Sequence, residues 1–180
     1  MSNNRDFIER WSLAGARYIK AHGGHPDISV GTMRFALQLW ISLLLIVALA
    51  CLISSLFGTV TQTLIALAAL CILRYFSGGW HFRRLHVCIV FTAAITAIIP
   101  LLPTPGPLSL LIMNSVSLLL VLLLAPTGHG QTFTSPTHKT VFKLIAIALV
   151  LISLIFIPKI ITISFLIQSF TLITMKGGDH

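Results

Sequence analysis

The chain has 180 residues, of which 56% are hydrophobic and 9% charged, and its mean hydropathy is +0.97. A sequence this apolar and this poor in charge does not belong to a soluble domain, and its length predicts one polytopic membrane domain. Acidic residues occur only near the two ends, which leaves no carboxylate for paired-carboxylate hydrolysis, proton relays or aspartyl proteolysis inside the membrane domain.

The first predicted element is an amphipathic helix over residues 4–21. Aromatic and small residues recur on one of its sides at helical spacing, whereas arginines tend to the other side. The residues of the apolar side are Phe7, Trp11, Ala14 and Tyr18, with Ile8, Gly15 and Ile19 beside them. Such a helix lies in the membrane interface rather than across the membrane. We therefore expect residues 1–34 to form an N-terminal interfacial segment.

Six apolar segments follow, and they predict six transmembrane helices. Their approximate bounds are 35–56, 59–73, 86–102, 108–125, 141–157 and 160–175. A membrane helix needs about 20 apolar residues, so the second and fifth segments are short. We expect an all-α fold with a membrane peptidase domain over 35–176 and a short cytoplasmic tail over 177–180.

Basic residues indicate which side of the membrane each segment end faces. With the N-terminus inside, every lysine and arginine except Lys159 falls on the cytoplasmic side, as the positive-inside rule requires. Both termini, the 74–88 stretch and the 126–140 loop are then cytoplasmic. The basic residues lie at segment ends rather than on one face, which favours membrane lipid as a partner and speaks against nucleic acid.

A polar, ionisable cluster lies at 74–88, between two apolar segments. It contains Arg74, Gly78, Gly79, His81, Arg83, Arg84, His86 and Cys88. Such groups are costly at a membrane boundary, so they are candidates for function. A cysteine nucleophile reacts as the thiolate, and cations or a histidine partner favour that form. Cys88 is the candidate nucleophile and His81 its candidate base, while His86 is less suitable because a helix would point it elsewhere.

The spacing of this pair sets a geometric requirement. The seven residues from His81 to Cys88 would rise about 10.5 Å along a straight helix, whereas a thiol–imidazole hydrogen bond needs about 3 Å. The chain must therefore bend, and the freedom of Gly78-Gly79 allows it to do so. Cys88 is then expected near the start of the next helix. The structural alternative is that this cluster only marks the membrane interface and the glycine pair only makes a turn.

Other polar residues are weaker candidates. The histidines that flank Gly23-Gly24 are too few for a metal site, and the sequence predicts no metal or other cofactor. His129 or His138, on the side of the cytoplasmic loop, could assist the pair. Asn114 could orient it, although isolated amides in apolar segments, such as Asn114 and Gln168, usually form hydrogen bonds between helices.

The order Arg-x-x-x-Gly-Gly-x-His-x-x-x-x-x-x-Cys, from Arg74 to Cys88, resembles the signature of the accessory gene regulator B (AgrB) family. Members of that family are membrane cysteine endopeptidases that process quorum-sensing pro-peptides in Gram-positive bacteria. The chain length, the amphipathic start, the six apolar segments and the prolines Pro126 and Pro136 also resemble the family. The 126–140 loop departs from it, because this loop is rich in glycine, threonine and histidine rather than in charge.

The resemblance implies a function for each residue of the cluster. Cys88 would form a thioester acyl-enzyme, with His81 as its general base. The implied candidates for substrate or oxyanion contacts are Arg74, Gly78, Gly79 and Arg84. The substrate would be an AgrD-like precursor with an amphipathic leader and an acidic tail, cleaved at the cytoplasmic face of the bacterial cell membrane so that a thiolactone or lactone ring can close. The resemblance also implies a homodimer.

A second class of function fits the six apolar segments as well. A non-enzymatic substrate-binding component of a small-molecule transporter would have this size and hydropathy. It would give no role to His81 and Cys88, and it should tolerate the replacement of Cys88.

Overall fold

The structure is a computed structural model, and it describes residues 7–23, 28–79, 85–126, 136–156 and 158–173. All regular structure in these ranges is helical, which confirms the all-α prediction. In chain order the elements are α1 (Phe7–Ala21), α2 (Val30–Ser55), α3 (Val60–Ser77), α4 (Leu85–Ile98), the 3₁₀ turn η1 (Ile99–Leu101), α5 (Pro107–Leu124), α6 (Pro136–Phe156) and α7 (Lys159–Ile173).

Each predicted apolar segment corresponds to one of the helices α2 to α7, but the lengths differ from the prediction. In the described residues, α2, α3, α5 and α6 are long and apolar enough to cross a membrane. The prediction that the second and fifth segments are the short ones is wrong, because α3 continues through Arg74 to Ser77 and α6 begins at Pro136. The shorter apolar helices are α4 with η1 and α7. Their crossing of the membrane, and hence the count of six spans, remains a prediction.

Local signals explain where several helices begin. The Ser29 hydroxyl accepts a hydrogen bond from the Thr32 amide at 3.1 Å and caps α2, which therefore starts at Val30, earlier than the predicted 35. Gly58 adopts a φ of +65° in the turn between α2 and α3. Pro107 occupies the first turn of α5, where its missing N–H has no helical partner to lose.

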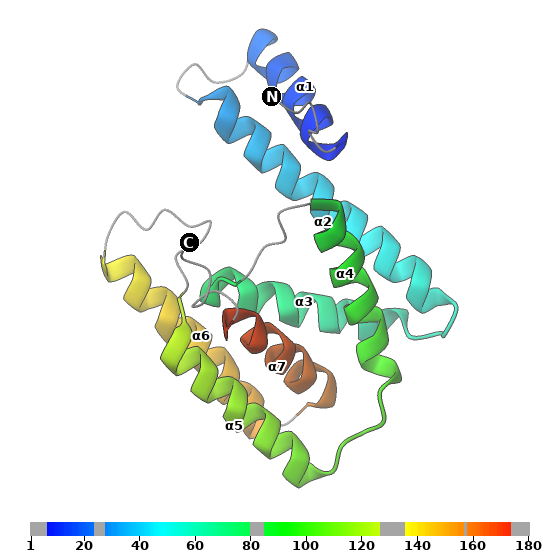
Figure 1. Cartoon of the computed structure of the whole chain (residues 1–180), viewed down its shortest axis with the longest axis vertical. Helices are drawn as coiled ribbons and strands as arrows, with labels where there is room; N and C mark the ends of the chain where they lie inside the picture. The colour runs from blue at the N-terminus through cyan, green and yellow to red at the C-terminus, as the bar shows by residue number, and fades with distance from the viewer. Residues whose placement is uncertain (1–6, 24–27, 80–84, 127–135, 157, 174–180) are drawn as a thin grey trace.

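Helix α1 packs beside the first half of α2 (Figure 1). It buries Ile8, Ser12 and Ala16, and Glu9 forms an ion pair with Arg34 of α2 at 3.3 Å. The predicted aromatic side points away from the protein, and its exposed side chains include Phe7 at 71%, Trp11 at 65% and Tyr18 at 66%. A helix that leaves three aromatic rings uncovered while packing small residues inward suits the membrane interface.

Helix α7 is the central helix of the remaining bundle, and it packs against both α3 and α5 (Figure 1). The main core cluster joins these helices to α6 through buried side chains such as Leu73, Val121, Val150, Phe165 and Leu172. The buried residues of α7 also include Thr162, Ser164, Gln168 and Ser169. Lipid tails are as apolar as leucine, so packing and polar contacts, rather than burial of apolar surface, hold membrane helices together.

The buried amide of Asn114 is one such contact. Its Nδ2 donates to the Ser153 carbonyl oxygen of α6 at 3.1 Å and to Thr162 Oγ1 of α7 at 3.2 Å. Asn114 is completely buried. It therefore ties α5 to both neighbouring helices, as expected for an isolated amide in an apolar segment.

Contacts between helix ends define two opposite ends of the helix bundle, which we call its poles. At one pole, the Phe142 ring of α6 lies 5.7 Å from that of Tyr75 and 5.4 Å from that of Phe76, so the end of α3 meets the start of α6. At the start of α7, Lys159 Nζ donates to the Leu102 carbonyl oxygen. Lys159 begins α7, whereas Gln168, towards the other end of that helix, contacts Gly78 at the end of α3. Which pole is cytoplasmic stays a prediction.

Candidate functional site

The 74–88 cluster contains the end of one helix and the start of the next. Helix α3 ends at Ser77, and the Gly78 amide donates to the Arg74 carbonyl oxygen at 2.9 Å. Gly78 and Gly79 have φ values of +75° and +143°, in the half of the backbone map that side chains other than glycine rarely adopt. The chain therefore leaves the helix at the glycine pair, and a straight helix through 78–88 is excluded. His81, Arg83 and Arg84 lie outside the described residues.

Cys88 lies in the first turn of α4, as the spacing argument predicts. The thiol is half-buried, and its Sγ lies 4.0 Å from Thr92 Oγ1, one turn further along the helix. Arg74, in the last turn of α3, is also half-buried. The structure thus brings Arg74 and Cys88, two residues of the predicted site, to the same small cavity.

This cavity has a volume of about 30 Å³, enough for about one water molecule. Helices α3, α4 and α7 form its wall. The lining residues are Leu70, Arg74, Cys88, Phe91, Thr92, Ile95, Ile167, Gln168 and Thr171. The polar groups are a guanidinium, a thiol, two hydroxyls and an amide, so the cavity offers hydrogen-bond donors and acceptors beside the thiol but no carboxylate.

Helix α7 is the part of this site that sequence reasoning missed. Gln168 is completely buried, and its Nε2 donates to the Gly78 carbonyl oxygen at 2.8 Å. The sequence shows Gln168 only as an isolated amide in an apolar segment. That pattern predicts a bond to another helix but does not say to which one.

Gly79 is packed against the same helix. A Cβ built at this position would lie 2.7 Å from Gln168 Nε2 and 2.8 Å from Thr171 Oγ1, closer than real Cβ atoms approach their neighbours. Glycine is thus required here both by the backbone conformation and by the close approach of α7.

The remaining candidates that the structure describes do not lie at this cavity. His86 and His138 are exposed, and neither lines it. The hydrogen bonds of Asn114 go to α6 and α7, so this amide is not an orienting partner of Cys88. His129 lies outside the described residues.

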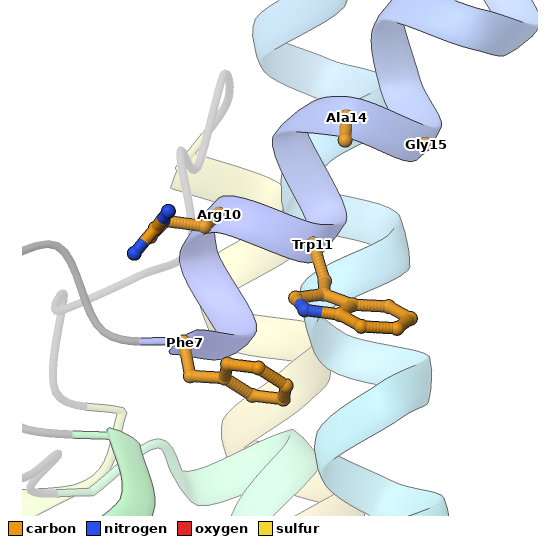
Figure 2. Close-up of a pocket in the computed structure, with 5 residues that line it drawn as sticks. All are labelled: Phe7, Arg10, Trp11, Ala14 and Gly15. Atoms are coloured by element: carbon orange, nitrogen blue, oxygen red, sulfur yellow. The ribbon is translucent and has the colours of Figure 1, made fainter.

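A larger and more open groove lies on α1. Its volume is about 600 Å³, and it is lined by Phe7, Arg10, Trp11, Ala14 and Gly15 (Figure 2). The two aromatic rings extend from the same side of the helix, while the Arg10 guanidinium points away from them. The groove contains no nucleophile or general base, so its chemistry suits contact with an apolar surface rather than catalysis.

Comparison with known families identifies the chain. The model of the family described as accessory gene regulator B, AgrB, matches residues 15–172. The chain belongs to this family. The match includes the whole 74–88 cluster and the described part of α7 up to Leu172. AgrB proteins take part in the processing of quorum-sensing peptides and act on the AgrD propeptide. No curated protein and no solved structure matches the chain.

Proposed function

We propose that this AgrB protein is a membrane cysteine endopeptidase that cleaves its pro-peptide at the cytoplasmic face of the bacterial cell membrane. The observation that carries the proposal is the meeting of Arg74 and Cys88 at one cavity, within a sequence matched by the family model. A nucleophilic cysteine works best near positive charge, which Arg74 supplies. The transporter-component alternative has no comparable support, because it assigns no role to this pair.

In the proposed reaction Cys88 is the nucleophile and His81 the general base. The imidazole takes the thiol proton, and the thiolate attacks the scissile carbonyl carbon. When the C–N bond breaks, the imidazolium gives its proton to the leaving amine. The C-terminal part of the precursor departs, and a thioester joins the N-terminal part to Cys88.

The thioester has two possible fates. A thiol or hydroxyl inside the bound peptide can give its proton to the neutral imidazole and attack the thioester carbonyl, which breaks the C–S bond, closes a thiolactone or lactone ring and releases Cys88 as the thiolate. Attack by water would give a linear peptide instead. The cavity has room for about one water molecule, so few water molecules compete with the internal nucleophile, which favours ring closure.

The distribution of charge suits a precursor with an acidic tail. Residues 28–178 contain no acidic residue, and Lys139 is exposed in the first turn of α6, at the same pole as the end of α3. A basic surface around the site attracts an acidic segment and sets its orientation. The exposed aromatic side of α1 would lie in the same membrane interface as an amphipathic leader. The functional unit is proposed to be a homodimer.

The test is cleavage of the AgrD-like precursor, co-expressed with the full-length protein, with release of its C-terminal tail measured by mass spectrometry. Cys88→Ala should abolish cleavage, and the wild-type protein should yield a Cys88 peptide that carries the acyl group. Cys51→Ala is the matched control, because Cys51 is also a half-buried thiol but lies in α2, away from the cavity. Normal cleavage by Cys88→Ala would disprove the proposed mechanism.

A further inference from the structure

The side-chain amide of Gln168 joins α7 to the glycine turn. Its Nε2 donates to the carbonyl oxygen of Gly78, a residue 90 positions earlier in the chain. A carbonyl oxygen can only accept, so this bond fixes which end of the amide is NH₂ and which is oxygen. The orientation of the amide is therefore determined by its partner.

The same contact restricts Gly79. The atoms that a Cβ at Gly79 would meet are Gln168 Nε2 and Thr171 Oγ1. Thr171 Oγ1 in turn donates to the Gln168 carbonyl oxygen at 2.7 Å. One turn of α7 thus holds Gly78 and Gly79, the first two residues of the segment that connects α3 to α4.

The other end of the amide has no partner among the described residues. Gln168 Oε1 is buried and accepts no hydrogen bond from any described residue. Buried polar atoms are almost always paired, so an unpaired acceptor calls for a donor. Gln168 lines the same cavity as Arg74 and Cys88, where an N–H group of a ligand or of the protein could reach it.

Among the described residues, Gln168 contributes the only side-chain amide that lines the cavity. Carboxylates are absent between 28 and 178. Asn114 also has a buried Oδ1 without a partner among the described residues, but neither Asn114, Gln38 nor Gln62 lines the cavity.

We infer that Gln168 is a positioning residue of the Cys88 site. Its N–H holds the Gly78 carbonyl, and its Oε1 accepts a hydrogen bond from an N–H donor that works in the cavity. The donor is a backbone N–H of the bound precursor. This inference rests on the proposed function, and it makes α7 part of the active site.

The experiment uses the full-length protein in detergent or vesicles and compares Gln168→Met with Asn114→Leu. Methionine keeps the length of glutamine but has neither the N–H nor the oxygen. Asn114→Leu removes another completely buried amide that does not touch the cavity, so it reports the effect of destabilising the bundle alone. Cleavage gives kcat and KM. Alkylation of Cys88 by iodoacetamide without substrate, followed by mass spectrometry over a range of pH, gives a second readout.

Gln168→Met should lower kcat/KM at least about tenfold more than Asn114→Leu, because small displacements of reacting groups cost up to about a hundredfold in rate. Because the lost partner is a group of the precursor, KM should rise while the pH profile of Cys88 alkylation stays that of the wild type. A loss confined to kcat would contradict this assignment.

A kcat/KM for Gln168→Met within about threefold of that for Asn114→Leu would overturn the inference. If Gln168→Met does not fold, Gln168→Glu replaces it, and its kcat/KM is compared with that of Asn114→Leu by the same criteria. Glutamate keeps the length of glutamine and an acceptor oxygen but loses the N–H that binds Gly78. Cleavage by Cys88→Ala would instead refute the proposed function. The two failures are therefore distinguishable.

Discussion

The replacement of Gly79 by alanine tests how tightly α7 holds the turn. An alanine at a φ of +143° costs about 1–3 kcal/mol in backbone strain. Its Cβ would also lie 2.7 Å from Gln168 Nε2 and would displace the 2.8 Å bond to the Gly78 carbonyl. Leaving that buried carbonyl unpaired costs about 1–3 kcal/mol more. We therefore expect Gly79→Ala to lower the free energy of unfolding by about 2–6 kcal/mol, with the structural change confined to the site.

Gly58→Ala is the matched control. Gly58 has a φ of +65°, and nothing lies within 4 Å of a Cβ at that position. Gly58→Ala should therefore lower the free energy of unfolding by only about 1–2 kcal/mol. The assays are unfolding in mixed micelles and precursor cleavage. Gly79→Ala should lower kcat by at least about tenfold, whereas Gly58→Ala should leave it nearly unchanged.

The double variant Gly79→Ala/Gln168→Ala isolates the clash from the strain. Truncation of Gln168 removes the atom that a Cβ at Gly79 would meet, so Gly79→Ala should cost less in this background than in the wild type. Two results would show that the close approach of α7 does not matter for function. One is that the free-energy costs of the two substitutions simply add. The other is that Gly79→Ala cleaves the precursor as fast as Gly58→Ala.

Three further predictions follow from other parts of the structure. Asn114→Leu should lower the free energy of unfolding in mixed micelles by about 1–3 kcal/mol, with kcat per folded molecule unchanged, and a loss of kcat would contradict this. Lys139→Glu should raise KM for an acid-tailed precursor more than Lys139→Gln does, with the difference shrinking in high salt; equal KM values would argue against charge attraction. In vesicles, Trp11→Cys should react with a water-soluble maleimide several-fold more slowly than Arg17→Cys, and equal rates would exclude insertion of the aromatic side of α1 into lipid.

Much of the fold could be predicted from the sequence, because apolar runs and glycine–proline breaks are local signals. Each predicted segment corresponds to one helix, and Cys88 lies in the first turn of α4, near the start of that helix as predicted. The lengths of α3 and α6 were harder to predict, because polar and aromatic residues such as Tyr75 and Thr140 extend each helix beyond its apolar run. Helix ends of this kind depend on packing between helices rather than on hydropathy.

Only part of the candidate site could be predicted from the sequence. Arg74, Gly78, Gly79 and Cys88 are close in sequence, and their residue types suggest cysteine chemistry. The contribution of Gln168 arises from the packing of α7 against α3, which no local pattern records. The side of α1 that packs on α2 was hidden for a related reason: the aromatic stripe is the more conspicuous signal, yet α2 is contacted by smaller residues.

The position of α7 in the chain also bears on how the protein is made. Gly78 precedes Gln168 by 90 residues, and a ribosome adding about 5–20 residues per second needs roughly 5–18 s to synthesise that interval. For most of this time the thiol of Cys88 has been translated but the helix that holds the glycine turn has not. If the turn depends on Gln168, a nascent or truncated chain cannot cleave peptides, and activity begins only when the last helix has entered the membrane.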